Sequence, residues 1–436
     1  MRYSYRRGLL WLAIYFLFSL IPLAVVSSGH IPEYRAFWIE FAVALGYIGL
    51  AMLALQFLFT GRLQKIAPSY GMDNLLHFHK EMGIVAFLFV LAHPIILIAV
   101  NPGFLAYFDP SINLLRAVFL SFASVALIFI MASSLWRATF NLSYETWRLI
   151  HGLLALAIVF IGLSHALQVG HYLNTFGKQA VVSVLIGGCM YAVIHTRLVR
   201  PWLNRKKPYR VVGVKEERGD AWSIEVEAVG HKKMQYQCGQ FAWLTIHDSP
   251  FSIQQHPFSM TSSTESDTLS FTAKVMGDFT STWKDIKIGD RLFLEGPFGS
   301  FTPIAGKNLF LIMGGIGITP GISMLRTMRD KKDKRKVTLI YGNENLEEAT
   351  FYEELEELNK ELNLQLLHLL TDPPKGWEGE TGKIDREFLE KYLPEDSENY
   401  IYLICGPDPL MDIAEIALKD LGMDWRYIYT ERFKIV

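Results

Sequence analysis

The sequence predicts a multidomain protein: a six-helix transmembrane bundle, then an antiparallel β-barrel, then an α/β domain with a parallel sheet. The chain has 436 residues, 51% of them hydrophobic and 19% charged, but its long apolar runs all lie before about residue 203. Polar and apolar residues alternate with a period of two from residue 209, and strand-like and helix-like patterns alternate from residue 308. These three patterns define the three parts.

The composition gives no support to a nucleic-acid-binding protein or to a cysteine-rich one. A net charge of −1 gives no indication of nucleic-acid binding, and three cysteines do not support a disulfide framework or a Cys-rich metal site.

Six apolar segments are long enough to cross a bilayer, which takes about 17 to 25 residues. They lie near 9–27, 37–59, 76–100, 113–135, 148–169 and 179–199. No clear A-x-A site follows the first, so we interpret it as a retained helix rather than a signal peptide. Lys and Arg gather before the first segment and after the second, fourth and sixth. The positive-inside rule then predicts that the N-terminus and the soluble half are cytoplasmic. We expect a multi-pass protein of the cell (plasma) membrane.

Histidines recur with one spacing in the third and fifth segments. His79 and His93 are 14 residues apart, as are His151 and His165. Fourteen residues nearly complete a whole number of helical turns, so each pair shares one helix face at two levels about 21 Å apart. Both segments run outward in the predicted topology. His79 is therefore expected to face His151 on the cytoplasmic side, and His93 to face His165 on the outer side.

Two histidines that meet across a helix bundle are able to ligate a haem iron from both faces. A hydrogen bond to a neighbouring helix and a proton relay are alternatives, but neither requires matched levels. Zinc is less favoured, because the two pairs lie too far apart along the helix and no Cys or carboxylate completes either level. The spacing favours two stacked haems. His77 faces a different side of the third segment and His171 lies in the outer loop, and either is a candidate for contact with haem propionates or an electron acceptor.

In the soluble half, the stretch LFLIMGGIGITPGISMLR places glycines where a buried strand turns into a helix. Such a turn lets the backbone and the helix N-terminus approach a pyrophosphate. Other short motifs accompany this one in a fixed order: CGQF (238–241), HPFSM (256–260), VMGDFTSTW (275–283), IGD (288–290), EGPFG (295–299), GGIGITP (314–320), YGN (341–343) and CGPDPLM (405–411).

This series of motifs resembles the ferredoxin-reductase-type flavoproteins, in which a flavin barrel precedes a nicotinamide domain. Together with the six-helix part it resembles the ferric-reductase and NADPH-oxidase superfamily. The resemblance implies a di-haem transmembrane domain (1–203), an FAD-binding barrel (204–304) and an NAD(P)-binding domain (305–436). It also implies three kinds of cofactor: FAD, two b-type haems, and NADH or NADPH.

The resemblance assigns roles within HPFS: Phe258 packs on the isoalloxazine, Ser259 reaches the flavin N5 edge, and His256, followed by Pro257, approaches the FAD phosphates. Ser259, Cys405 and Phe433 are the expected catalytic residues, with Phe433 placed against the flavin. The remaining cofactor-binding residues fall into three groups. They are Gly277, Thr280 and Ser281 for the FAD pyrophosphate; Gly314, Gly315, Gly317, Thr319 and Pro320 in the nicotinamide loop, with Pro320 starting the helix; and Cys405, Gly406 and Pro407 near the nicotinamide ring.

Three glutamates, Glu344, Glu347 and Glu348, stand where NADPH users commonly carry a cation for the 2′-phosphate. This favours NADH, unless these glutamates only begin a helix. The expected function is electron transfer from NAD(P)H through FAD and the haems to an acceptor outside. Dioxygen, giving superoxide, is favoured over a ferric chelate, and a quinone is a further alternative. The lipid bilayer is the expected partner, and no protein partner is required.

Overall fold

The computed structural model describes residues 5–61, 72–137, 139–246 and 249–432. They form two compact units, one almost entirely from residues up to Arg200 and the other from Pro201 onward. Each unit is described by itself below.

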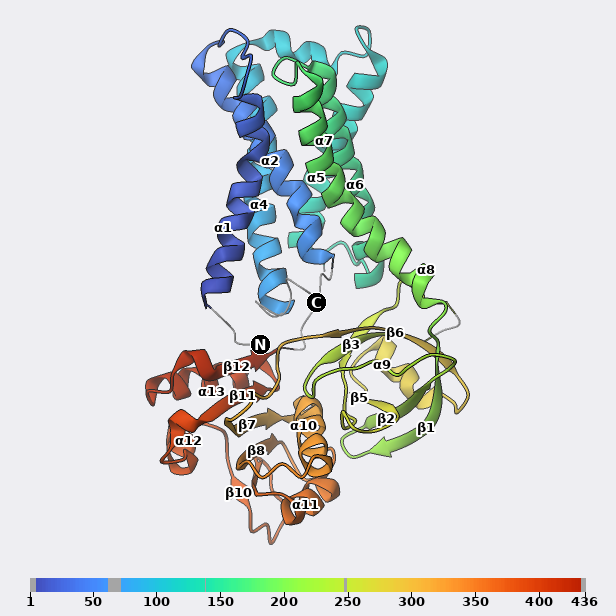
Figure 1. Ribbon diagram of the computed structural model, residues 1–436, viewed down its shortest axis with the longest axis vertical. Helices are drawn as coiled ribbons and strands as arrows, with labels where there is room; N and C mark the ends of the chain where they lie inside the picture. Colours follow the sequence, from blue (N-terminus) through green and yellow to red (C-terminus); the bar gives the residue numbers. More distant parts are fainter. Residues whose placement is uncertain (1–4, 62–71, 138, 247–248, 433–436) are drawn as a thin grey trace. The chain divides into compact units, whose positions relative to one another are not determined.

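The first unit is a bundle of long helices (Figure 1). Six of its helices are long and apolar enough to cross a membrane, and the described residues thus confirm the predicted transmembrane bundle. Their bounds are α1 Tyr5–Val26, α2 Phe37–Thr60, α4 Met72–Val100, α5 Leu114–Leu135, α6 Tyr144–Val169 and α7 Phe176–Ile194. The sixth apolar segment ends differently from the expectation, because a π-helical turn, His195–Val199, follows α7 and leads into the short helix α8, Arg200–Asn204.

Polar residues at the ends of the apolar runs explain where several helices begin. The side chains of Asn113, Ser143 and Thr175 accept hydrogen bonds from the free backbone N–H groups of α5, α6 and α7. Between α4 and α5, Asn101 caps the 3₁₀ turn η1, Pro102–Phe108, in the same way. α2 is the most buried of the six spans.

The second unit begins with an antiparallel barrel. Its strands are β1 Tyr209–Glu217, β2 Ala221–Ala228, β3 Phe241–Thr245, β4 His256–Ser259, β5 Leu269–Lys274 and β6 Arg291–Phe298, in the order β4-β3-β6-β1-β2-β5. An isolated bridge between Met260 and Phe271 links the two edges, so the sheet curls round on itself. β1 and β2 form an antiparallel hairpin joined by residues 218–220. Two short helices, α9 Asp278–Ser281 and η3 Thr282–Asp285, lie between β5 and β6.

A parallel sheet of order β10-β9-β8-β7-β11-β12 completes the unit. Its strands are β7 Asn308–Gly314, β8 Val337–Asn343, β9 Leu364–Leu370, β10 Glu380–Thr381, β11 Tyr400–Cys405 and β12 Ile428–Glu431. The accompanying helices are η4 Gly315–Gly317, α10 Ile318–Asp330, α11 Tyr352–Glu361, α12 Arg386–Tyr392, η5 Ser397–Asn399, α13 Asp408–Asp420 and η6 Trp425–Tyr427. The predicted alternation of strand and helix, and with it the fold class, is confirmed.

Helix α10 joins the parallel sheet to the barrel. The Arg326 guanidinium binds the Glu354 carboxylate through two bonds of 2.6 Å and donates to the Thr261 carbonyl at 2.7 Å. The Ser323 hydroxyl donates to the Ser262 carbonyl at 2.8 Å. Thr261 and Ser262 directly follow the HPFSM motif, so the helix that begins at the glycine turn is hydrogen-bonded to the segment just after that motif.

Candidate functional site

His79 of α4 and His151 of α6 face each other, as the spacing predicted. Their ring centres are 6.2 Å apart and the ring planes meet at 64°. Two imidazoles bound to opposite sides of one metal ion, each through a bond of about 2 Å, have ring centres about 6 Å apart. The separation of this pair therefore fits two residues that would hold one haem iron between them.

The hydrogen bonds around this pair leave nitrogens available for a metal. The Ser134 hydroxyl donates its proton to the Ile130 carbonyl at 2.6 Å. In its 3.4 Å contact with Nδ1 of His151, the hydroxyl oxygen is therefore the acceptor. That long contact favours a proton on Nδ1 of His151 and a lone pair on Nε2. Nδ1 of His79 is buried and has no hydrogen-bond partner among the described residues. Both observations fit residues that hold a group from outside the chain.

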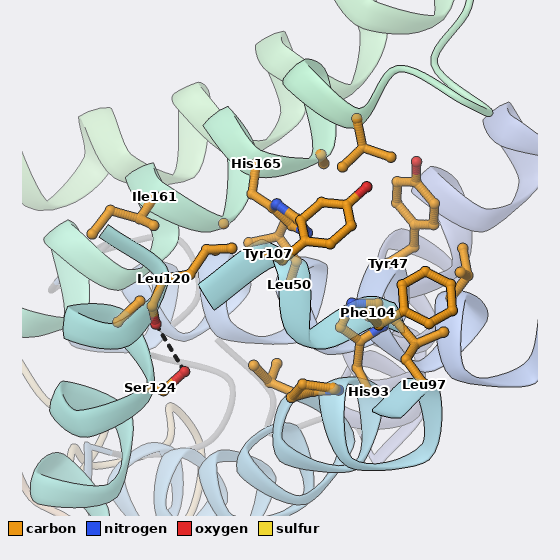
Figure 2. Close-up of a pocket in the computed structure, with 18 of the residues that line it drawn as sticks. Tyr47, Leu50, His93, Leu97, Phe104, Tyr107, Leu120, Ser124, Ile161 and His165 are labelled. Atoms are coloured by element: carbon orange, nitrogen blue, oxygen red, sulfur yellow. Dashed lines mark hydrogen bonds between the residues drawn. The ribbon is translucent and has the colours of Figure 1, made fainter. Parts of the chain in front are cut away.

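The second pair, His93 of α4 and His165 of α6, lines a cavity of about 230 Å³. Figure 2 shows the two side chains entering this space from different helices. Most of the other lining residues are apolar and come from α2, α4, α5 and α6; examples are Leu50, Leu97, Leu120 and Ile161.

The orientation of His93 is fixed from α2. Its Nδ1 lies 2.8 Å from the carbonyl oxygen of Ala42. A carbonyl oxygen only accepts, so Nδ1 carries the proton and Nε2 keeps the lone pair that a metal ligand needs. Gly46, one turn further along α2, makes room for the ring, since a Cβ there would lie 2.8 Å from the same Nδ1. The four histidines thus fit a pair of haems, and His79, His151, His93 and His165 are the residues that would hold them.

Several residues around the second pair were missed by the sequence analysis. Arg35, Tyr47 and Tyr172 line the cavity, and so does His171, which the sequence had marked only as a candidate contact. The Tyr172 hydroxyl donates to the Glu40 carboxylate, which also accepts from Nε of Arg35 at 3.0 Å. Burial, and then the bond to Glu40, raise the pKa of Tyr172 to about 12, so its hydroxyl stays protonated. An Arg and a Glu beside a transmembrane segment were the available signal.

In the barrel, β4 carries the HPFS motif. The Ser259 hydroxyl is buried, with 4% of the residue exposed, and has no hydrogen-bond partner in the described chain. Such a group fits a donor to a bound flavin nitrogen. The ring of Phe258 lies 4.7 Å from that of Trp283, and the His256 ring stacks on Phe279 at 4.0 Å. Pro257 pairs with Trp243 of β3. The motif therefore packs against a group of aromatic side chains that includes Phe279 and Trp283.

The three residues predicted to hold the FAD pyrophosphate form one compact turn. The Thr280 hydroxyl accepts from the backbone N–H of Met276 at 2.9 Å and of Gly277 at 3.2 Å. The Ser281 hydroxyl donates to the Asp278 carbonyl at 2.7 Å. These donors are engaged within the turn, so a phosphate would have to replace some of these bonds.

The glycine turn of the parallel sheet packs directly on the loop after β11. A Cβ on Gly317 would lie 2.5 Å from the carbonyl oxygen of Cys405, and one on Gly406 would lie 3.0 Å from the backbone N of Gly314. A Cβ on Gly314 would meet Pro407 at 3.0 Å. The structure therefore brings together two predicted groups that are some 90 residues apart in sequence. Both lie at the carboxyl ends of neighbouring parallel strands, where α/β sheets bind nucleotides.

The remaining residues of the glycine turn differ slightly from the expectation. Helix α10 begins at Ile318, so Pro320 lies within its first turn and does not start the helix. A proline is tolerated there because its missing N–H would have no partner in the helix. Gly315 adopts a left-handed φ of +51°, and the Thr319 hydroxyl donates to the Ile316 carbonyl at 3.1 Å. Nearby, the Tyr341 hydroxyl donates to the Gly315 carbonyl, and burial raises the pKa of Tyr341 above its usual range.

The three glutamates after β8 lie in a loop. Helix α11 begins only at Tyr352, so the alternative that they begin a helix is wrong. The carboxylate of Glu348 pairs with Lys274 of the barrel, whereas Glu344 and Glu347 are exposed. Glu344 directly follows β8 and is the glutamate best placed to meet a ribose. Phe433 lies outside the described residues.

Comparison with known families divides the chain in the same order. Residues 45–162 match a ferric reductase like transmembrane component, residues 214–302 match an FAD-binding domain, and residues 311–415 match an oxidoreductase NAD-binding domain. The first match includes His79, His93 and His151, and His165 lies just beyond it.

Curated relatives resemble only part of the chain. NADH-cytochrome b5 reductase 1 of Lodderomyces elongisporus is 36% identical over 143 residues, which are 32% of this chain and 48% of the relative. The plasma membrane-associated coenzyme Q6 reductase of Saccharomyces cerevisiae is 33% identical over 154 residues, which are 34% of this chain and 49% of the relative. The chain thus spans about half the length of the curated relatives it matches.

Among solved structures, a flavohemoglobin from Malassezia yamatoensis with bound FAD and heme has a TM-score of 0.50 at 18% identity. It covers 91% of this chain and 99% of its own. This likeness concerns the fold alone.

The transmembrane bundle and the two soluble domains define a membrane flavoprotein with the domains of an oxidoreductase. More particularly, the chain is a fusion of the ferric reductase/NADPH oxidase type.

Proposed function

We propose that the chain carries electrons from cytoplasmic NAD(P)H across the cell membrane to an acceptor on the outer side, with FAD and two b-type haems as the carriers. The chemistry of electron transfer belongs to these cofactors when they are bound. The chain positions them: His79 and His151 hold one haem, His93 and His165 hold the other, and the HPFS strand and the glycine turn hold the flavin and the dinucleotide.

The observation that carries this proposal is the 6.2 Å separation of the His79 and His151 rings at one level, repeated by a second pair around a cavity at the other level. A proton relay needs a chain of hydrogen-bonded groups, whereas Nδ1 of His79 has no partner among the described residues. Zinc would need further ligands, and the described residues contain no cluster of three or more His, Cys, Asp or Glu side chains suited to a metal ion.

Dioxygen is the proposed acceptor, which would give superoxide. The cavity around His93 and His165 is mainly apolar, which suits a small neutral molecule. Among its lining residues in the described chain, Arg35 is the only Lys or Arg, and it is already paired with Glu40. An anionic ferric chelate would find little attraction there.

A ferric chelate is the second candidate acceptor, favoured by the match to a ferric reductase like component. The coenzyme Q6 reductase relative brings in a quinone as a third outcome of the experiment below. For the electron donor we propose NADH: Glu344 stands where a 2′-phosphate would be repelled, and the similar proteins include NADH-cytochrome b5 reductases.

The test is an anaerobic titration of the detergent-purified chain, loaded with FAD and haem, with NADH and separately with NADPH. The proposal expects the haem absorbance bands to reduce with NADH and to reoxidise in air, with superoxide detected by a dismutase-sensitive probe. Reoxidation only after ferric-EDTA is added would replace dioxygen by a ferric chelate, and reoxidation only after a quinone is added would replace it by a quinone. If no haem is bound, the proposed electron path is wrong.

A further inference from the structure

The turn η1, between α4 and α5, is built to hold one conformation. The Asn101 side chain accepts from the Gly103 N–H at 2.9 Å and caps the first turn. At the other end, the Asp109 carboxylate accepts from both the N–H and the hydroxyl of Ser111. The residues that flank the turn on each side are therefore held by local hydrogen bonds.

This turn supplies a wall of the cavity around His93 and His165. Phe104, Tyr107 and Phe108 all line the cavity, whereas Leu105 of the same turn is 53% exposed. Figure 2 shows Phe104, Tyr107 and the two histidines around this cavity, with the Tyr107 ring beside that of His165. Since η1 directly follows α4, and His93 lies in the second half of α4, the turn closes the end of the bundle that is far from His79.

One arginine fixes the ring nearest to His165. Arg116, in the first turn of α5, donates from Nη2 to the Ala106 carbonyl at 3.0 Å. Its guanidinium carbon also lies 4.5 Å from the centre of the Tyr107 ring, a cation–π contact. The Tyr107 ring in turn meets His165 edge-on, with centres 5.7 Å apart and planes at 83°. Arg116 therefore holds Tyr107, and Tyr107 packs against His165.

We propose that η1 is the element that selects the electron acceptor, with Tyr107 and Arg116 as its positioning residues. This inference rests on the proposed function and extends it. Electron transfer slows steeply with distance, so an acceptor that is kept outside the aromatic wall reacts slowly. Dioxygen is small and neutral and passes between the rings, whereas a hydrated ferric chelate is held at a distance. The selection works by excluding the wrong acceptor.

The test compares variants of the full, haem-loaded chain after anaerobic reduction. Each is mixed in a stopped-flow instrument with dioxygen or with ferric-EDTA, and the rate of haem reoxidation is measured. Tyr107→Ala is expected to raise the ratio of the ferric-EDTA rate to the dioxygen rate severalfold. Tyr107→Phe keeps the ring and should keep the ratio of the unmodified chain. Leu105→Ala, on the exposed side of the same turn, is the matched control and should also keep it.

A spectroscopic measurement separates positioning from a loss of structure. Low-temperature electron paramagnetic resonance of the oxidised chain should show altered g values for one haem in Tyr107→Ala and unaltered values in Tyr107→Phe. If Tyr107→Ala fails to retain haem, Arg116→Met is tested instead, because it removes the contacts that hold the turn without removing a ring. We expect a smaller rise in the ratio of the ferric-EDTA rate to the dioxygen rate.

An unchanged ratio in the haem-loaded variants would overturn the inference, and so would unchanged g values in Tyr107→Ala. Neither result would contradict the proposed electron path. That path is wrong only if the haems are not bound or are not reduced by the nucleotide.

Discussion

Nδ1 of His93 lies 2.8 Å from the carbonyl oxygen of Ala42, so a backbone group of α2 sets the orientation of a proposed haem ligand on α4. Such partners of a metal ligand fix its tautomer and its ring orientation. The ring also needs space beside α2, which Gly46 provides. α2 is therefore part of the proposed second haem site, although it carries none of the four histidines.

Substitution Gly46→Ala tests this role of α2. A Cβ at this position would lie 2.8 Å from Nδ1 of His93, and the ring cannot move away without losing its bond to Ala42. We expect a local cost of about 1–3 kcal/mol and a lower affinity for one haem, measured as the haem-to-protein ratio during dilution. Gly188→Ala, on α7, which carries no proposed haem ligand, is the matched control, since no described neighbouring atom lies within 4 Å of the new Cβ. Equal haem retention by both variants would contradict the prediction.

Substitution Gly317→Ala tests the contact between the glycine turn and the loop after β11. The new Cβ would lie 2.5 Å from the Cys405 carbonyl oxygen, and backbone yields less readily than a side chain. We expect weaker NADH binding by about 1–3 kcal/mol, seen in the concentration of NADH that half-saturates flavin reduction, with FAD content unchanged. Gly321→Ala in the same helix places its Cβ no closer than 3.4 Å to any neighbour and should bind NADH normally. Similar losses in both variants would show that the helix, rather than the contact, is responsible.

Substitution Glu344→Arg tests the choice of nucleotide. Replacing an exposed carboxylate by a guanidinium removes repulsion of a 2′-phosphate and adds attraction. We expect the preference for NADH over NADPH, measured as the ratio of kcat/KM values for flavin reduction, to fall by at least about fivefold. Glu361→Arg, a change of the same charge at the end of α11, is the control. If the preference for NADH falls equally in both variants, the change in overall charge, rather than the position of Glu344, is responsible.

The stability of the soluble unit should depend on pH through His368 of β9. Burial lowers the pKa of His368 below its usual value of 6.5, although the nearby Glu356 carboxylate, 3.1 Å from Nε2, opposes this shift. Within the part of the chain that the structure describes, the rings of Tyr352 and Tyr341 are the other titratable groups packed against His368. The native imidazole stays neutral while the unfolded one takes up a proton. The stabilisation is therefore complete above the unfolded pKa and is lost as the pH falls through 6.5 toward the folded pKa.

This dependence is measured as the midpoint of thermal unfolding of the full chain between about pH 7 and pH 5. His368→Gln removes the titration and should reduce the fall of the midpoint over this range. An unchanged fall in His368→Gln would assign the dependence to other groups.

Features of the fold and of the candidate site that depend on periodicity could be predicted from the sequence. The 14-residue spacing of His79 and His93 places both on one face of a helix whatever surrounds them, and the motif order separates barrel from parallel sheet. Contacts between distant segments leave no such periodic trace. The bond from His93 to Ala42, the pairing of Glu348 with Lys274 and the packing of Tyr107 on His165 each depend on how separate elements meet. For the same reason, Pro320 looked like the start of a helix that begins at Ile318.

The most direct test of the central claim is the haem-to-protein ratio of the purified chain and of three single variants. The account predicts a ratio of two for the unmodified chain and of one for both His79→Ala and His93→Ala, with reduction of FAD by NADH preserved. His77→Ala, an exposed histidine on the same helix, should keep a ratio of two. A ratio that stays at two in His93→Ala would contradict the assignment of His93 and His165 as a ligand pair.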